Sequence, residues 1–229
     1  KDLVIDYDSL IENIDENKCC IVLANPNSPI GDILGLNQIE EILKKSSKYN
    51  IPILIDEAYI EYSEQESCIK FLEKYNNLVI SRTFSKAYGC AGLRIGYLLA
   101  NKGIMNVINK FIPTYEISSI SAKFGLYLLN HQKVISDYLN LIKQEREKIK
   151  IICEEHDIKY IINHINTIYL KPKNIENIIS RLNNERLFYR TRKLPYDDDD
   201  WLAIVLYPDF TDGNIMKIIR DENNMSLNN

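Results

Sequence analysis

The feature that most constrains the fold is the alternation of short apolar runs with amphipathic segments along the first hundred residues. Four apolar runs have the length of buried strands: residues 19–25, 51–55, 78–81 and 95–100. Three segments carry apolar side chains at helical spacing: residues 36–49, 67–75 and 104–111. Strands that alternate with helices in this way predict an α/β fold with a mainly parallel sheet. We expect Asn37 to cap the first of these helices.

The pattern changes after Pro113. A long helical segment is predicted over residues 118–155, with a break near His131. Its second part places one apolar stripe on the helix, formed by Val134, Tyr138, Leu141, Ile149 and Ile152. Two strand-like runs, residues 160–170 and 201–206, enclose a predicted helix over residues 175–187. The sequence therefore predicts a large domain over residues 1–113 and a smaller C-terminal α+β domain over residues 114–229.

Composition narrows the functional classes. The formal charge of −4 and the pI near 5.5 argue against a nucleic-acid surface. No apolar run approaches the length of about 20 residues that a membrane-spanning helix needs, so no membrane partner is expected. Five scattered cysteines indicate reduced thiols in a cytoplasmic protein, with Cys19 and Cys20 packed in a strand. Three separated histidines predict no metal site, and the acidic run 197–200 is interpreted as a solvated loop.

Three short motifs carry the residues capable of chemistry. They are NPNSPIG at 25–31, DEAYIEY at 56–62 and SRTFSKAYGCAGLRIGY at 81–97. Each motif follows a predicted strand. Ligands of open α/β sheets bind beyond the carboxyl ends of the strands, where the connecting loops converge. We therefore expect Asn27, Ser28, Asp56 and Lys86 to share one edge of the sheet.

Together the three motifs resemble those of the fold type I pyridoxal-phosphate aminotransferases, and most closely the histidinol-phosphate aminotransferase branch. The resemblance is specific over the first hundred residues and looser beyond them. It implies that Lys86 is the catalytic lysine, forming a Schiff base with pyridoxal 5'-phosphate. It also implies that Asp56 pairs with the pyridinium nitrogen and that Tyr59 hydrogen-bonds the 3-oxygen of the ring. The cofactor phosphate would be held by Thr83, Ser85 and Arg94.

These roles suit the chemistry of the side chains. A carboxylate that keeps the ring nitrogen protonated lets the ring accept electrons from a substrate carbanion. Hydroxyl groups and a planar guanidinium match phosphate oxygens. The implied activity moves an amino group between an amino-acid donor and a phosphorylated or anionic oxo acceptor. The implied assembly is a homodimer.

Three departures from the family pattern bear on function. Ser28 stands where the family usually has an asparagine that contacts the 3-oxygen, with Asn27 one residue earlier. Ala203 stands where the family has an arginine that binds the substrate carboxylate. Arg190 matches a family arginine at the phosphate end of the substrate, although a solvent-facing role is equally compatible with the sequence.

The third departure is the absence of the family's N-terminal part, about 100 or more residues on typical domain sizes. The chain begins at Lys1, and we expect it to lack that part. Other readings therefore stay open. One is a pyridoxal-phosphate decarboxylase of the phosphothreonine type, and another is a catalytically degenerate aminotransferase-like module of a larger polypeptide. A dinucleotide-binding domain is remote, because no GxGxxG follows the first strand.

Overall fold

The computed structural model of the protein describes residues 3–114, 116–195 and 197–225. These residues form two compact units. The large unit contains Val4–Ser28 and Asp32–Ile135. The small unit contains Leu3, Pro29–Gly31 and the described residues from Ser136 onward.

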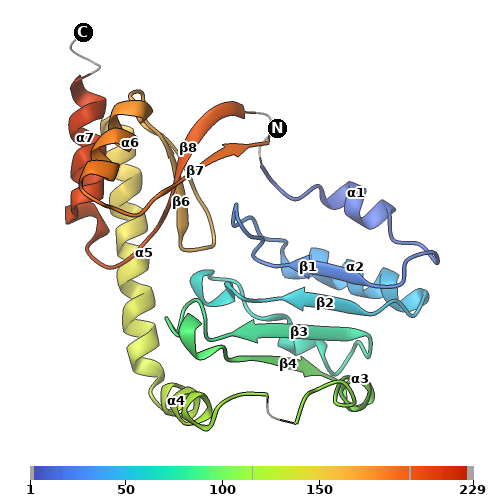
Figure 1. The fold of residues 1–229 in the computed structure, drawn as a ribbon. Coiled ribbons are helices and arrows are strands. Elements are labelled where there is room, and N and C mark those ends of the chain that lie inside the picture. The colour runs from blue at the N-terminus through green and yellow to red at the C-terminus, as the bar shows by residue number, and fades with distance from the viewer. Residues whose placement is uncertain (1–2, 115, 196, 226–229) are drawn as a thin grey trace. The chain divides into compact units, whose positions relative to one another are not determined.

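A four-stranded sheet in the order β1-β2-β3-β4 forms the centre of the large unit (Figure 1). Its strands are β1 (Ile21–Ala24), β2 (Ile53–Asp56), β3 (Leu78–Thr83) and β4 (Gly96–Ala100). The first three strands run parallel, and β4 runs antiparallel to β3. The prediction of a mainly parallel sheet is confirmed, with an antiparallel strand at one edge.

Helices surround this sheet, and α2 contributes the most to its buried core. They are α1 (Tyr7–Glu12), α2 (Leu36–Lys48), α3 (Lys102–Ile108) and α4 (Ser119–Asn130), with the short 3-10 helices η1 (Ile60–Tyr62), η2 (Cys68–Phe71) and η3 (Ala91–Leu93). On α2, Ile39, Ile42 and Leu43 are at most 1% exposed and belong to the same buried cluster as the strand residues. Burying each such side chain contributes about 1.5–3 kcal/mol to folding.

The start of α2 differs from the prediction. The N-cap is Gly35, whose N–H donates to Oε1 of Gln38 at 2.9 Å. Asn37 lies inside the first turn, so its predicted role as the cap is wrong. The glutamine side chain folds back and accepts the N–H of the N-cap residue itself, which is the contact that the third helical residue makes in a capping box.

The helix predicted over residues 67–75 is also wrong. The structure has the short helix η2 there, followed by turns. The carboxylate of Glu57 accepts the N–H of Cys68 at 2.7 Å, so a side chain from another segment holds the start of this stretch. So short a helix has little stability of its own, because nucleation is costly. The apolar pattern nevertheless marks the buried face, formed by Cys68, Phe71 and Tyr75.

The small unit is an antiparallel sheet with helices. Its strands, in the order β5-β6-β8-β7, are β5 (Lys159–Ile162), β6 (Thr167–Lys171), β7 (Arg190–Leu194) and β8 (Asp197–Val205). The helices that complete it are α5 (Gln132–Glu155) from Ser136 onward, α6 (Ile175–Asn184), the 3-10 helix η4 (Phe210–Asp212) and α7 (Asn214–Met225). The run predicted as one strand over residues 160–170 is two antiparallel strands.

The predicted break near His131 is confirmed, since His131 is the C-cap of α4 and α5 begins at the next residue. The predicted stripe along α5 is correct at Ile149, which is fully buried, but wrong at two positions in the first half of the helix. Val134 and Leu141 are 57% and 43% exposed, whereas the neighbouring Ile135 and Ile142 are buried. The pattern is obscured by Glu145, which lies on the buried side and is 2% exposed. Its carboxylate accepts the N–H and the hydroxyl of Thr211, both at 2.8 Å.

The acidic run 197–200 is the first part of β8, so its interpretation as a loop is wrong, although Asp198, Asp199 and Asp200 are exposed to solvent as expected. Asp197 accepts two hydrogen bonds from Lys171, at 3.1 and 2.9 Å, and one from the indole N–H of Trp201 at 3.0 Å. The bond from Lys171 is the main reason that the pKa of Asp197 is lowered to about 2. The acidic composition of this segment is typical of a loop. These partners, together with the pairing to β7, keep it in the strand conformation.

Cysteine burial also departs from the prediction. Cys19 and Cys20 are exposed, because β1 begins only at Ile21. Cys68 and Cys153 are buried, and burial is the main cause that raises the pKa of each thiol to about 12.

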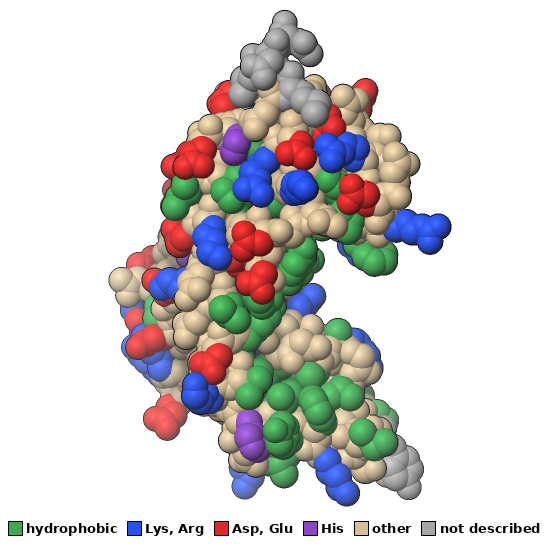
Figure 2. All heavy atoms as spheres, turned by 90° about the vertical axis from the view of Figure 1, so that its left-hand side faces the viewer, with side chains coloured by type: hydrophobic (Ala, Val, Ile, Leu, Met, Phe, Trp, Pro, Cys, Tyr) green, Lys and Arg blue, Asp and Glu red, His purple; other side chains and the backbone are tan. Residues whose placement is uncertain are grey.

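Two surface properties complete the description. Figure 2 shows hydrophobic side chains gathered over α4, among them Ile120, Phe124 and Tyr127, which line an apolar hollow of about 410 Å³ with Lys123. Among the described residues, no helix is both long enough and apolar enough to cross a membrane.

Candidate active site

The residues of the three motifs in the large unit lie at one edge of its sheet. Asp56 is the last residue of β2, and its register partners are Ala24 on β1 and Ser81 on β3. Thr83 is the last residue of β3 and pairs with Gly96, the first residue of the antiparallel strand β4. The carboxyl ends of three strands and the amino end of the fourth therefore meet at this edge (Figure 1).

Lys86 lies in a closed loop that directly follows β3. Its neighbours Phe84 and Ala87 are 3% and 2% exposed, so they anchor the loop while Lys86 stays half-buried between them. The N–H of Gly89 donates to the carbonyl of Lys86 at 2.9 Å and closes a turn. Gly89 has φ of +66°, a conformation that glycine adopts without steric cost.

The amine of Lys86 has an aromatic neighbour. Its Nζ lies 4.9 Å from the centroid of the Tyr59 ring, within the range of a cation–π interaction. Tyr59 comes three residues after Asp56 and is the N-cap of η1, whose Ile60 and Tyr62 are buried. The structure therefore brings Lys86 and Tyr59, two of the predicted site residues, into direct contact.

Asp56 is held by the neighbouring strand. Ser81 donates a hydrogen bond from Oγ to Oδ1 of Asp56 at 2.8 Å, and both residues are half-buried. Among the described residues, no other side chain donates to this carboxylate in a hydrogen bond that the structure shows. Ser81 stands inside the third motif but had no predicted role.

A second polar contact joins the same two strand ends. Glu57 is fully buried, and its Oε2 accepts two hydrogen bonds from Arg82, at 3.0 Å from Nε and 2.8 Å from Nη2. The hydroxyl of Ser67 and the N–H of Cys68 donate to the same carboxylate, each at 2.7 Å. Burial alone would lower the pKa of Arg82, but the bond and charge of Glu57 outweigh it, and the pKa is raised.

The hydroxyl of Thr83, at the end of β3, is already bonded to the backbone of the loop. Oγ1 of Thr83 donates to the carbonyl of Ile95 at 3.2 Å and accepts the N–H of Ser85 at 3.0 Å. Arg94 is exposed, with φ of +53°, and its Nη1 donates to the carbonyl of Ala91 at 3.0 Å. Thr83 therefore joins the end of β3 to both Ser85 and the segment that follows Arg94.

Asn27 and Ser28 follow β1 at the same edge. Asn27 is half-buried, and its Oδ1 accepts the N–H of Asp32 at 2.9 Å, which closes the turn of the first motif. Ser28 is exposed. Arg190, the ninth predicted site residue, belongs to the small unit, where it is exposed at the start of β7.

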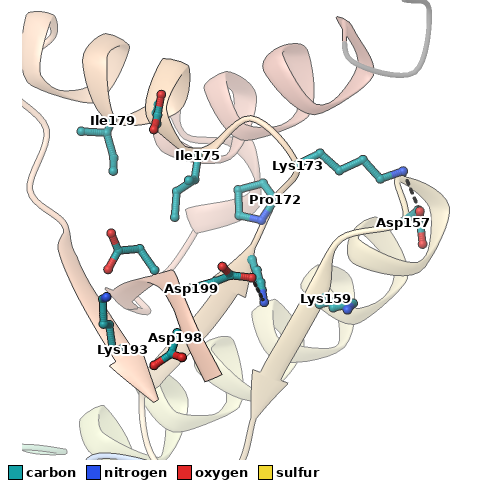
Figure 3. A pocket seen from close by; sticks show the side chains of 12 residues that line it. Asp157, Lys159, Pro172, Lys173, Ile175, Ile179, Lys193, Asp198 and Asp199 are labelled. Atoms are coloured by element: carbon teal, nitrogen blue, oxygen red, sulfur yellow. Dashed lines mark ion pairs between the residues drawn. The ribbon is translucent and has the colours of Figure 1, made fainter. Parts of the chain in front are cut away.

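The small unit has a hollow of its own, of about 640 Å³ (Figure 3). It is lined by lysines and carboxylates over a wall formed by Pro172, Ile175 and Ile179. Several of these charges pair with one another, including Lys173 with Asp157 at 2.7 Å and Lys171 with Asp199 at 2.7 Å. The hollow contains none of the residues of the three motifs, and we assign no ligand to it.

Among the residues that the structure describes, no group of histidine, cysteine or acidic side chains could hold a metal ion. The polar groups missed by the sequence reasoning are Ser81, Glu57 and Arg82. All three stand inside the quoted motifs. The sequence marks them only by their position at the ends of predicted strands. Their contacts can be inferred from that position once the pairing register is known.

Comparison with known proteins adds an independent finding. Residues 1–219 match the family model "Aminotransferase class I and II". The histidinol-phosphate aminotransferase of Ruminiclostridium cellulolyticum is 34% identical over 171 residues, covering 74% of this chain and 47% of that protein. The chain thus spans about half the length of the curated relatives it matches.

Solved structures share the fold. The histidinol-phosphate aminotransferase of Clostridium acetobutylicum matches with a TM-score of 0.86 and 23% identity, over 98% of this chain and 70% of that one. The histidinol-phosphate aminotransferase of Sinorhizobium meliloti, solved in complex with pyridoxal-5'-phosphate, matches with a TM-score of 0.82 and 24% identity. This second match covers 99% of this chain and 63% of that chain.

Proposed function

Since the chain belongs to the class I and II aminotransferase family, we propose that it carries the cofactor lysine of a pyridoxal-phosphate-dependent aminotransferase. The observation that supports this most strongly is the placement of Lys86. Its amine lies over the Tyr59 ring at the sheet edge where Asp56 ends β2. A nucleophilic amine, an aromatic hydroxyl and a carboxylate thus gather at one edge of one unit.

The residues at this edge fit pyridoxal phosphate by their chemistry. Lys86 would bond the aldehyde, Asp56 would accept the ring N–H, and Tyr59 would donate to the 3-oxygen. When bound, the cofactor supplies a positively charged ring that accepts the electron pair of the substrate α-carbon. Ser85 and Arg94 would bind the phosphate. Thr83 would join them if its hydroxyl gave up its bond to Ile95, and otherwise would act as a brace.

Two further side chains follow β1 and are proposed to complete the ring contacts. Asn27 would contact the ring from the turn of the first motif, which its Oδ1 closes by accepting the N–H of Asp32. The exposed Ser28 would donate in place of the asparagine usual in the family. Lys86, once released from the cofactor, would carry a proton to and from the substrate α-carbon.

The substrates are proposed from the names of the relatives, which are histidinol-phosphate aminotransferases. The acceptor would be a phosphorylated or anionic oxo compound and the donor an amino acid. The position of Arg190 supports an anion contact. In the antiparallel register of β7 and β8, Arg190 pairs with Ala203, so both side chains start from the same face of the sheet.

The alanine at position 203 is the reason to consider a second function. It is 7% exposed and packs with Tyr169, Leu194 and Trp201. The methyl group cannot bind a carboxylate, and a decarboxylase of the phosphothreonine type is the alternative. In either reaction, replacing Arg190 by alanine should raise the Michaelis constant for the phosphorylated substrate. An unchanged Michaelis constant would show that Arg190 does not contact the substrate.

The test of the cofactor assignment uses borohydride reduction of the full-length protein incubated with pyridoxal phosphate. We expect one cofactor mass on the peptide that contains Lys86. Lys86→Ala should abolish the label, whereas the exposed Lys18→Met should keep it. A protein that takes up no cofactor, or labelling that persists in Lys86→Ala, would overturn the assignment and favour a degenerate module.

Substrate class is then tested by half-reactions of the loaded enzyme. Conversion of the bound cofactor to its amine form by glutamate or histidinol phosphate supports the aminotransferase. Carbon dioxide release from a phosphorylated amino acid, without that conversion, supports the decarboxylase.

We also propose the assembly state, the domain boundary and the cellular location of the protein. The homodimer and the division at residues 113 and 114 rest on the family resemblance and on the change of pattern along the chain. A cytoplasmic location is supported by the scattered cysteines, which are free thiols in the structure.

A further inference from the structure

The hydrogen bond between Ser81 and Asp56 has the features of a built contact. The two residues are register partners in the parallel pair β2 and β3. Because side chains alternate between the faces of a strand, register partners start from the same face. The Oγ to Oδ1 distance is 2.8 Å, within the range of a strong hydrogen bond to a carboxylate.

The opposite face of the same strand ends is locked independently. Glu57 and Arg82 each follow one member of the Ser81–Asp56 pair along the chain, and they are joined by two hydrogen bonds at 3.0 and 2.8 Å. A slip of register would break this buried ion pair as well as the Ser81 bond. The relative position of Ser81 and Asp56 is therefore fixed by a contact that does not involve either of them.

The side-chain carboxylate of Asp56, at the end of β2, needs a partner that fixes its orientation. The χ2 torsion of aspartate is broad, so a carboxylate at a strand end can rotate between several orientations. A donor on Oδ1 selects one of them and leaves Oδ2 available to accept a further N–H. A charge-assisted hydrogen bond of this kind contributes about 1.5–3 kcal/mol.

We propose that Ser81 is the positioning residue for Asp56: its hydroxyl orients the carboxylate toward the ring nitrogen of the bound cofactor. This rests on the proposed function. Ser81 touches neither substrate nor cofactor and acts only through Asp56.

The matched variants are Ser81→Thr and Ser81→Val, which have the same shape and differ in the hydroxyl. Both are β-branched and suited to a strand. In the loaded enzyme we expect Ser81→Thr to keep the single-turnover rate of the amino-donor half-reaction within about threefold. Ser81→Val should lose about 10- to 100-fold, the range that corresponds to the loss of one charge-assisted bond. Its primary isotope effect with α-deuterated donor should rise, because proton removal becomes slower.

A deaza analogue of the cofactor, with carbon in place of the ring nitrogen, separates positioning from a structural effect. If Ser81 acts through the ring nitrogen, Ser81→Thr and Ser81→Val should react at equal rates with this analogue. A difference that persists with the analogue would overturn the proposal, and so would equal rates with the natural cofactor. If Ser81→Val does not fold, Ser81→Ala replaces it, and urea unfolding without cofactor confirms that the compared variants are folded.

The outcome also distinguishes this inference from the proposed function. If the wild-type protein fails to form a bond between Lys86 and the cofactor, the proposed function fails. If it forms that bond and Ser81→Val behaves as Ser81→Thr, only the role of Ser81 is refuted.

Discussion

Replacing Arg82 by methionine should strongly destabilise the large unit. The substitution keeps most of the aliphatic stem and removes the guanidinium that donates twice to Glu57. The Glu57 side chain is 0% exposed and that of Arg82 is 17% exposed, so the remaining carboxylate would be buried without a cation. Removing one partner of a buried ion pair costs about 3–5 kcal/mol. The partial exposure of Arg82 places the expected loss near the lower value, at about 3 kcal/mol.

Urea unfolding followed by circular dichroism measures this loss. With a slope of about 1–3 kcal/mol per molar urea, the midpoint should fall by about 1–3 M. The exposed ion pair between Lys18 and Asp15, 3.5 Å apart, provides the control, because Lys18→Met should change the stability by less than about 1 kcal/mol. Adding Glu57→Gln to Arg82→Met should recover part of the stability, since the neutral amide still offers an oxygen to Cys68.

The destabilisation should also depend on pH. Burial is the main cause that raises the pKa of Glu61, while Arg82, 3.7 Å away, lowers it. A carboxyl with a raised folded pKa opposes folding once it ionises, so its penalty grows as pH rises above the unfolded value near 4.3. Without Arg82 this penalty increases, and Arg82→Met should be less destabilised at pH 5 than at pH 7. A loss no larger than that of Lys18→Met, or no recovery with Glu57→Gln, would refute the reasoning.

Three further outcomes can be measured on the same protein. The folded pKa of Asp197, about 2, lies below the unfolded value near 3.9, so its contribution to stability is complete above about pH 5 and is lost as the pH falls toward about 2. Asp197→Asn, which removes the carboxylate bonded to Lys171, should flatten thermal stability across that window; an equally steep curve would contradict this. Iodoacetamide at pH 8 should alkylate the exposed Cys20 in the native protein and Cys68, with its pKa of about 12, only after unfolding. Rapid native labelling of Cys68 by mass spectrometry would contradict its burial. Because residue 94 has φ of +53°, Arg94→Gly should be more stable than Arg94→Ala by about 1 kcal/mol in urea, and equal midpoints would argue against backbone strain.

The order of strands and helices in the first half was predictable because burial imposes a period that survives in the sequence. The runs at 51–55 and 78–81 are mostly apolar, as is typical of strands in a parallel sheet, and Ile53, Ile55, Leu78 and Ile80 are at most 1% exposed. The same logic misplaced part of the stripe of α5, where the buried Glu145 interrupts the apolar period. A buried carboxylate cannot be recognised without its partner, and Thr211 is 66 residues away.

Failures of the opposite kind occurred where polar residues form regular structure. The aspartates that begin β8 carry the composition of a loop, and they are a strand because β7 supplies backbone partners and Lys171 supplies charge. The contact with Lys171 joins residues 26 positions apart, and the pairing with β7 depends on the register of the hairpin that β7 and β8 form. Local propensity has no access to them, because strand preference depends largely on the neighbouring strands.

The residues of the candidate site also differ in whether the local sequence or the strand pairing determines their role. Residues such as Lys86 and Asp56 could be proposed from the sequence because three motifs stand in a fixed order, each at the end of a predicted strand. Ser81 and Arg82 were not, although they are adjacent in the third motif, because their roles depend on which residue of β2 stands opposite. Register sends Ser81 to Asp56 and Arg82 to Glu57. The two neighbouring pairs thus have different roles. The bond of Ser81 orients the carboxylate of Asp56, and the ion pair of Arg82 with Glu57 fixes the strand register on which that bond depends. A substitution on the buried face should therefore affect the proposed site only by shifting β2 against β3, and it should alter stability before it alters the contact of Ser81 with Asp56.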